Sequence, residues 1–406
     1  MNFSKMFFGF CFCVATFFFS ACNHSIEQKV ANVEMNQPQA TIAWVKPISV
    51  STNRYCAWGT ITTKKDGELV AVFSGDRNGH VCFSGKVQLI RSLDNGQTWS
   101  SPETIYSSCV DDRDSGIVQM PDGNLLVSFF SSLETRREKL MSGQKESFTI
   151  FKNTTKQERA EVLGNWTMRS VDDGKGKKWA KPVRTFSSTP YGAISLKDGR
   201  MLFVGKYRDR QIDPLENPKE WWANRESGIF VEESTDYGRT WKIIAQIPVA
   251  KDFVNSRKKF VGEPHVVECD NGTLIVHLRQ HHKDNIYTLQ SHSNDGGKTW
   301  SNAQYTDIRG YPSFLLNIGK GKILATYARR LKDDAGIFAR VSSDNGKSWG
   351  EEIKLTGKLK AGTDLGFGDL GYPSSTLTKD GYIISMYYMA ASDGVGMYAT
   401  KWKLKE

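Results

Sequence analysis

Two short segments of the sequence hold residue types that suit acid–base chemistry beside a carboxylate. Glu263 and Arg279 stand sixteen residues apart, and Tyr372 follows in a Gly-Tyr-Pro-Ser-Ser segment. An arginine can bind a carboxylate through two parallel hydrogen bonds. A tyrosine or a histidine can donate or accept a proton during a reaction. These types together predict a site that binds an acidic group and transfers protons next to it.

Further polar residues stand where strands are expected to end. Asp112 and Arg113 belong to a run of four charged residues, and His265 and His281 lie close to the first segment. We predict that these four residues contribute to substrate binding. The alternatives are a solvated loop with local salt bridges for the charged run and a structural role for each histidine. No group of His, Asp and Glu has a spacing distinctive of a metal site, so we predict neither a metal nor another cofactor.

A repeated motif indicates how these segments are positioned. The pattern Ser-x-Asp-x-Gly-x-Thr-Trp is typical of a hairpin turn, known as an Asp box. Its Asp accepts hydrogen bonds from the turn backbone, its Gly takes a positive φ, and its Trp packs under the hairpin. Four clear copies and a longer, degraded fifth copy occupy residues 92–99, 234–241, 293–300, 342–349 and 170–179.

A second repeat gives the number of units. Six turns of the Asp-Gly type, each followed by an alternating apolar run, lie at 66–67, 122–123, 198–199, 271–272, 320–321 and 380–381. Such turns are strong hairpin signals, and their spacing of 49 to 76 residues suits one blade each. The sequence therefore predicts an all-β fold, a six-bladed β-propeller of four-stranded antiparallel blades. The last apolar run, 396–402, is expected to pair with residues 42–48 and close the ring.

The segments that hold Glu263, Arg279 and Tyr372 resemble those of the sialidase (neuraminidase) superfamily, in which Asp boxes recur. The similarity extends over about residues 50–402 and marks the chain as a divergent member. The resemblance implies that Tyr372 acts as the nucleophile, that Glu263 is its proton-accepting partner, and that Arg279 binds the substrate carboxylate.

The chain departs from the family pattern at three positions. The acid/base aspartate of the family is matched by His80, which we predict to be catalytic. The third carboxylate-binding arginine is matched by Arg330, some positions early. The first arginine has only an out-of-register neighbour, Arg54. An imidazole titrates near neutral pH and can take a proton as readily as it gives one.

Three functions remain open on these residues. The favoured one is elimination at a non-reducing-end uronic acid by an exo-acting lyase or dehydratase, for example on rhamnose–glucuronate glycans such as ulvan, because His and Tyr beside a neutralised carboxylate suit that reaction. The first alternative is an exo-α-sialidase, a glycoside hydrolase. The second is a non-catalytic glycan-binding propeller, because the Asp boxes alone carry no chemistry.

The N-terminal residues predict export to a bacterial cell envelope. Residues 1–22 read as a lipoprotein signal peptide with Cys22 as the lipidated residue, residues 23–45 as a tether, and residues 46–406 as the propeller. An ordinary cleaved signal is the alternative. We expect membrane attachment through the lipid and a monomer.

Charge and cysteine content narrow the partners. The formal net charge of +10 favours an acidic oligosaccharide or polysaccharide, and the lack of a basic stripe or binding motif argues against nucleic acid. Cys56 could pair with Cys82 or Cys109 in an oxidising compartment.

Overall fold

The computed structural model describes residues 38–49, 55–133, 149, 152–208, 219, 228–253, 260–281, 286–331, 334–356, 369–391 and 394–405. The predicted signal peptide, the lipidated Cys22 and most of the predicted tether lie outside these ranges. Within them no helix is long and apolar enough to cross a membrane.

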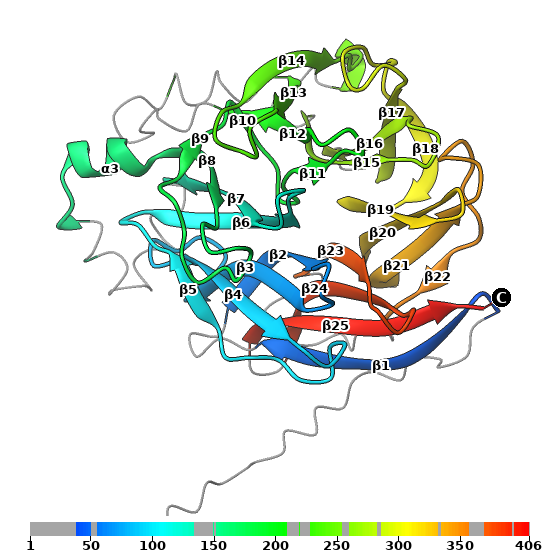
Figure 1. Cartoon of the computed structure of the whole chain (residues 1–406), viewed down its shortest axis with the longest axis horizontal. Helices are drawn as coiled ribbons and strands as arrows, with labels where there is room; N and C mark the ends of the chain where they lie inside the picture. The colour runs from blue at the N-terminus through cyan, green and yellow to red at the C-terminus, as the bar shows by residue number, and fades with distance from the viewer. Residues whose placement is uncertain are drawn as a thin grey trace, which may run out of the picture.

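The described strands form antiparallel sheets that surround a central axis, so the chain is an all-β propeller (Figure 1). Three sheets have four strands: β6 (Asp111–Gln119), β7 (Leu125–Ser132), β8 (Gly164–Arg169) and β9 (Val183–Arg184); β15 (Phe260–Glu268), β16 (Leu274–His281), β17 (Tyr287–Ser293) and β18 (Gln304–Arg309); and β19 (Ser313–Gly319), β20 (Lys322–Leu331), β21 (Asp334–Ser342) and β22 (Ile353–Lys354).

A fourth sheet has five strands because its inner strand is in two pieces. It contains β10 (Ser187–Ser188), β11 (Ile194–Ser195), β12 (Met201–Tyr207), β13 (Ile229–Ser234) and β14 (Lys242–Ile247). Both β10 and β11 pair with β12. Helix α3 (Lys156–Val162) precedes β8, and a short 3-10 turn, η3 (Lys251–Phe253), follows β14.

The fifth sheet has eight strands and contains both ends of the propeller. It holds β1 (Ala40–Ser49), β2 (Tyr55–Thr63), β3 (Leu69–Arg77), β4 (Lys86–Ser92), β5 (Glu103–Tyr106), β23 (Leu370–Leu377), β24 (Ile383–Ala391) and β25 (Gly394–Leu404). A single parallel pair, Tyr55 with Val395, joins its two groups of strands. Backbone pairing therefore gives five sheets and not the six separate ones that the turn count predicts.

Ring closure by the two ends of the chain is confirmed. Strand β1 pairs antiparallel with β25 from Ala40 opposite Leu404 to Ser49 opposite Met397, and the two run side by side in Figure 1. Because β1 begins at Ala40, the predicted boundary between tether and propeller at residue 45 is too late. Closure leaves no open edge between the first and last strands, which removes a template for unwanted pairing.

The six turns of the Asp-Gly type are confirmed as hairpins. Each connects an inner strand to the next strand of its sheet, and the glycine of each has a positive φ. These glycines, with φ between 70° and 94°, are Gly67, Gly123, Gly199, Gly272, Gly321 and Gly381. A left-handed backbone is open to glycine at little cost, which explains the residue type at this point of the repeat.

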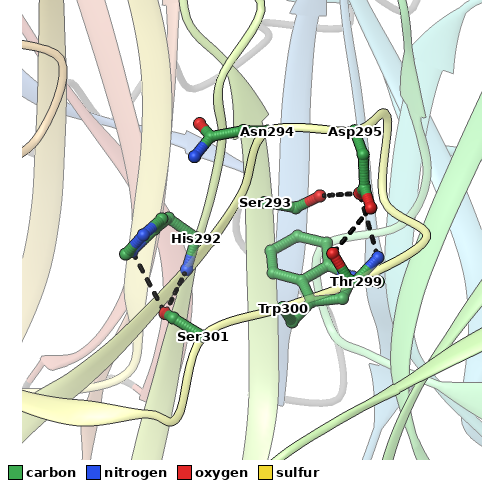
Figure 2. Close-up of a pocket in the computed structure, with 7 residues that line it drawn as sticks. All are labelled: His292, Ser293, Asn294, Asp295, Thr299, Trp300 and Ser301. Carbon is green, nitrogen blue, oxygen red and sulfur yellow. Dashed lines mark hydrogen bonds between the residues drawn. The ribbon is translucent and has the colours of Figure 1, made fainter.

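The Asp boxes connect the third and fourth strands of their sheets. In the box between β17 and β18, the hydroxyls of Ser293 and Thr299 donate to the Asp295 carboxylate at 2.8 and 2.6 Å (Figure 2). The amide of Thr299 donates to the same carboxylate at 2.9 Å. Trp300 donates to the carbonyl of Gly297 under the turn. The boxes therefore fix the hairpins, and the degraded box at 170–179 holds its turn in the same way through Asp172.

The hydrophobic core lies between neighbouring sheets and along their inner strands. The four cysteines of the propeller, Cys56, Cys82, Cys109 and Cys269, form no disulfide, so the two suggested pairings are not found. The propeller is therefore held together by packing and strand pairing in its described residues.

Candidate active site

Four inner strands share a backbone feature that turns one side chain toward the centre of the propeller. Trp58 in β2, Asp114 in β6, Glu263 in β15 and Tyr372 in β23 have φ of 50°, 58°, 49° and 50°. At each of them the strand loses register with its neighbour, which is the mark of a β-bulge. A positive φ costs a bulky residue about 1–3 kcal/mol and clusters at functional sites. The four bulges therefore point to the axis of the propeller as the candidate site.

Each of the four bulge residues lies eight positions before the first residue of its hairpin turn. Trp58 precedes Asp66, Asp114 precedes Asp122, and the two remaining residues precede Asn271 and Asp380 by the same interval. The interval is constant because each inner strand runs from the centre to the turn over the same length. Counting back from the turns identifies Trp58 and Asp114, which were not among the predicted site residues.

Tyr372, Glu263 and Arg279 meet in one hydrogen-bonded cluster. The Tyr372 hydroxyl donates to Glu263 Oε1 at 2.7 Å, and Arg279 Nη1 donates to Glu263 Oε2 at 2.7 Å and to the Tyr372 hydroxyl at 3.2 Å. Arg279 also lies over the ring of Tyr311, 4.5 Å from its centroid. The fold thus brings together the two sequence segments that contain these residues, which lie on strands β15, β16 and β23.

Burial and neighbouring charges together set the protonation states of Tyr372 and Arg279. Burial, followed by the negative charge of Glu263, raises the pKa of Tyr372 well above its ordinary value, so its phenol keeps its proton near neutral pH. Burial by itself would lower the pKa of Arg279, but Glu263 and Tyr372 together raise it, so the guanidinium stays charged. The cluster therefore combines a phenol that can donate, a carboxylate that can accept its proton, and a fixed cation.

Arg330 brings a second cation to Tyr372. Its Nε donates to the carbonyl of Leu370 at 2.7 Å, its Nη2 donates to the Tyr388 hydroxyl at 3.3 Å, and its guanidinium lies 5.6 Å from the Tyr372 ring centroid. A Cβ on Gly371 would lie 2.7 Å from Arg330 Nη2, and the φ of Gly371 is +142°. Glycine before Tyr372 therefore gives Arg330 the room to lie against the cluster.

His80 contacts two aromatic residues of β2. Its Nδ1 is 2.9 Å from the hydroxyl of Tyr55, and its ring makes an edge contact with Trp58 at 4.7 Å between centroids. Trp58 contacts Tyr388, and Tyr388 contacts Tyr372, at 5.9 and 6.0 Å. A continuous series of ring contacts therefore connects His80 to Tyr372.

Comparison with known proteins identifies the family. Residues 137–384, more than half of the chain, match the model of the BNR repeat-like domain. The chain belongs to the BNR repeat-like family. No curated protein sequence matches it significantly.

Solved structures with the same fold are numerous and distant. A protein of unknown function from Dyadobacter fermentans is 22% identical with a TM-score of 0.69, and the match covers 91% of this chain and 100% of that one. The NanB sialidase of Streptococcus pneumoniae, as a K499G mutant, is 14% identical with a TM-score of 0.60, covering 92% and 71%. The Trypanosoma rangeli sialidase in complex with sialic acid is 17% identical with a TM-score of 0.56, covering 90% and 59%. These likenesses establish the sialidase-like fold of this BNR propeller.

Arg113 and Asp114 contribute charge to the same centre of the BNR propeller. The guanidinium of Arg113 lies 4.3 Å from the Trp58 ring centroid, and its Nε is 3.5 Å from Asp114 Oδ1. Asp114 is among the charges that raise the pKa of Tyr372. The neighbouring Arg77 is fully buried and forms two hydrogen bonds with Asp111 at 2.6 and 3.0 Å. Of Arg77, Arg113 and Asp114, only Arg113 was predicted to be a site residue.

Asp112 does not reach this centre, contrary to the prediction. Its carboxylate is fully buried and accepts hydrogen bonds from the Ser108 amide at 2.6 Å and the Ser131 hydroxyl at 2.5 Å. Burial raises the pKa of Asp112 to about 7. Asp114 faces the centre in its place because the bulge at this residue breaks the strict alternation of side chains along β6. We therefore assign Asp112 to the scaffold of the BNR propeller.

His265, which the sequence predicts to bind substrate, lies within the scaffold of the BNR propeller. It is buried, its Nδ1 accepts the amide hydrogen of Leu315 at 2.9 Å, and its ring stacks on Phe314 at 3.9 Å between centroids. Burial lowers the pKa of His265 to about 3, so the imidazole is neutral. The side chain of His281 and the whole of Arg54 lie outside the described residues.

Two buried hydrogen-bond donors at the centre of the BNR propeller have no protein partner among the described residues. They are the hydroxyl of Tyr191, which is 2% exposed, and Nε of Arg279. Tyr191 lies 6.5 Å from Tyr372 between ring centroids. Buried donors of this kind are normally satisfied by water or a ligand, so both suit a polar ligand at the axis.

The site offers no set of metal ligands. No group of three His, Cys, Asp or Glu residues that could hold a metal ion occurs within the described ranges. The hollow drawn in Figure 2 lies on the Asp-box hairpin, where Ser293 and Thr299 donate to Asp295 and the Ser301 hydroxyl lies 3.1 Å from His292 Nδ1. We therefore place the candidate site at the axis and not at this hairpin.

Proposed function

We propose that this BNR propeller is an exo-acting carbohydrate-active enzyme that acts on the terminal acidic sugar of anionic oligosaccharides or polysaccharides. The observation that carries the proposal is the Tyr372 hydroxyl, which lies within hydrogen-bonding distance of both Glu263 and Arg279. Arg279 and Arg330 supply two fixed cations for a carboxylate, and guanidinium groups bind carboxylates with defined geometry. A phenol beside them can then take part in proton transfer.

Elimination at a uronic acid is the favoured reaction. A base removes the proton on C5, next to the carboxylate, the bond from C4 to its oxygen substituent breaks, and a C4–C5 double bond forms. In this proposal His80 takes the C5 proton, Arg279 and Arg330 neutralise the carboxylate, and Tyr372 gives its proton to the departing oxygen. A terminal uronate with a free hydroxyl on C4 loses water, which is the dehydratase reaction, whereas a lyase requires a uronate whose C4 oxygen carries the sugar that departs. Exchange with solvent restores His80 and Tyr372.

One feature favours elimination over hydrolysis by a sialidase mechanism. The position that matches the family's acid/base aspartate holds His80, whose imidazole can take a proton near neutral pH. An exo-α-sialidase is the second candidate, because a Tyr–Glu pair at 2.7 Å also suits a tyrosine nucleophile whose proton passes to Glu263.

Product analysis distinguishes these reactions. Elimination from glucuronate-ended rhamnose–glucuronate oligosaccharides, such as those of ulvan, forms a conjugated uronate that absorbs ultraviolet light. Hydrolysis releases sialic acid from a fluorogenic sialoside without such absorbance. We expect the first result. Release of sialic acid would favour the second candidate, and glycan binding without either product would overturn both in favour of a binding protein.

The setting of the enzyme is part of the proposal. We propose that the eight-stranded sheet is two blades divided at the Tyr55–Val395 pair, which gives six blades in all.

We also propose that Cys22 carries a lipid that holds the propeller, as a monomer, on the bacterial cell envelope. Labelling of intact cells with a radioactive fatty acid, compared between the wild type and Cys22→Ala, tests the anchor.

A further inference from the structure

We propose that Tyr55 and Asp369 are positioning residues that fix the tautomer of His80, so that Nδ1 carries the hydrogen and Nε2 is the proton acceptor. The role of Nε2 as a proton acceptor rests on the proposed function, because the reaction in which it takes a proton is the proposed elimination. The arrangement of the hydrogen bonds is independent of that function and can be tested without substrate.

The three groups form a chain of hydrogen bonds between distant parts of the sequence. The Tyr55 oxygen is 2.9 Å from His80 Nδ1 and 3.1 and 3.4 Å from the two oxygens of Asp369. Tyr55 begins β2 and is buried, while Asp369 directly precedes β23, the strand that carries Tyr372. The chain therefore joins the loop that holds His80 to the strand that holds the candidate nucleophile or acid.

Counting protons along this chain fixes the tautomer. A phenol has one hydrogen to donate, and an ionised carboxylate can only accept. The hydrogen of Tyr55 is therefore directed to Asp369, and only lone pairs of the phenol oxygen face His80. His80 Nδ1 must then donate, which leaves the lone pair of a neutral imidazole on Nε2. Burial, followed by the charges of Tyr388 and Asp369, raises the pKa of Tyr55 well above its ordinary value, so the phenol keeps this hydrogen.

The same series of hydrogen bonds places the negative charge of Asp369 near His80, with Tyr55 between them. When Nε2 accepts a proton, the imidazolium is stabilised by Asp369 through the polarised phenol. The same carboxylate takes part in a side-chain hydrogen bond with Tyr388, whose hydroxyl accepts from Arg330. The two halves of the candidate site are thus connected through Asp369 and Tyr388.

The scaffold histidines have a different environment. His265 accepts a backbone amide hydrogen, and His277 lies 2.8 Å from the Ser313 hydroxyl and 3.0 Å from the Gln290 side-chain oxygen. Both are buried, and both are held by neutral groups. His80 is half-buried and is linked to a carboxylate, an arrangement that in enzymes orients an imidazole for proton transfer.

Nitrogen NMR of the histidine side chains in the full chain tests the arrangement directly. The sequence has seven histidines, so His80 is assigned by the signals that His80→Gln removes. We expect neutral His80 in the wild type to carry its hydrogen on Nδ1. We expect Tyr55→Phe to shift it toward Nε2, whereas Tyr387→Phe, which removes a buried hydroxyl bonded to Thr400, leaves it unchanged. An Nε2-protonated His80 in the wild type, or no change in Tyr55→Phe, would overturn the proposal.

The pH dependence of turnover separates this role from a structural one. Removing the charge in Asp369→Asn keeps an acceptor for Tyr55 but no longer stabilises the protonated imidazole. We expect the acid limb of the pH–rate profile to move to lower pH, kcat at its optimum to fall about tenfold, and Asp369→Glu to restore part of the loss. An unmoved limb would contradict the role of Asp369. If the NMR result holds and no uronate is converted, the proposed function fails while the positioning chain stands.

Discussion

Two regions of the propeller centre use the same backbone feature to present different side chains. In β15 and β23 the bulges present Glu263 and Tyr372, which share hydrogen bonds with Arg279. In β2 and β6 they present Trp58 and Asp114, and the titratable group beside them is His80. By the resemblance of the sequence to sialidases, the first region has the residue types expected of that family, whereas the second has His80 at the position expected to hold an aspartate.

The difference between the two regions indicates which of them distinguishes elimination from hydrolysis. A tyrosine, a carboxylate and an arginine can serve either substitution or elimination, so the β15–β23 region alone does not choose between them. In the proposed mechanism the β2–β6 region supplies His80, so that region decides which proton donor or acceptor faces the sugar. Variants that affect one region and not the other therefore test the account, and they follow in order of expected effect.

The largest effect is expected from Tyr372→Phe. Removing the hydroxyl abolishes proton donation and the hydrogen bond to Glu263, so kcat is expected to fall by about 1000-fold or more, with little loss of fold. Activity assays and thermal melts of Tyr372→Phe and of the control Tyr387→Phe check this. Full activity in Tyr372→Phe would remove this residue from the mechanism.

A smaller effect is expected from Arg330→Lys, compared with its neighbour Arg329→Lys. Arg330 lies against Tyr372, while Arg329 pairs with Asp334 and Glu352 in the scaffold. Loss of one charge-assisted hydrogen bond to a carboxylate corresponds to about 1.5–3 kcal/mol, or roughly 10- to 100-fold in kcat/KM. Arg329→Lys should lower the melting temperature and keep kcat/KM. Equal losses of kcat/KM in both variants would show that Arg330 acts only through stability.

For the scaffold histidines, His265 and His277, we expect a dependence of folding stability on pH and no effect on activity. Burial lowers the pKa of His265 to about 3 and that of His277 to about 4, below an unfolded value of about 6.5. The unfolded chain therefore binds more protons below pH 6.5, and stability is complete above that pH and is lost as pH falls toward 4. Each histidine contributes up to about 1.4 kcal/mol per pH unit in this window.

Denaturant unfolding between pH 7.5 and 4.5 measures this loss. His265→Asn keeps an acceptor for the Leu315 amide and removes the titrating ring, so its stability should fall less steeply with decreasing pH than that of the wild type. An identical slope would show that His265 is protonated in the folded protein, which would remove the contrast between the scaffold histidines and His80.

The smallest effect on activity is expected from Asp344→Ala, in the Asp box between β21 and β22. Asp344 accepts hydrogen bonds from the hydroxyl of Ser342 at 2.7 Å and the amide of Ser348 at 2.9 Å. Their loss should cost roughly 1 kcal/mol of unfolding free energy and change kcat/KM by less than about twofold. A large loss of activity at unchanged stability would show that the box takes part in the reaction.

The repeats of the sequence predicted the architecture because each hairpin is specified locally. A glycine at the turn and an Asp within the box are short-range signals, and the pairing of β1 with β25 follows from the need to close the ring. The count of separate sheets was less predictable, because the single pair between Tyr55 and Val395 depends on how two distant strands meet.

Only those site residues that lie within a recognisable sequence motif could be predicted. Glu263, Arg279 and Tyr372 were found from their segments, and the constant interval before each turn could have added Trp58 and Asp114. Asp112 was chosen because it lies in a charged run at an expected strand end, and such a run does not show which of its side chains the bulge at Asp114 turns toward the site. The contact between Tyr55 and Asp369 joins residues 314 positions apart, and no local pattern signals such a contact.

The most direct measurement compares two oligosaccharides that differ only at C6 of the terminal sugar, one ending in glucuronate and the other in glucose. If the Tyr372 cluster acts on an acidic sugar held by Arg279 and Arg330, the wild type converts the glucuronate-ended compound to an ultraviolet-absorbing product, and Tyr372→Phe does not. The glucose-ended compound should remain intact. Equal conversion of both compounds, or unchanged conversion by Tyr372→Phe, would contradict the account.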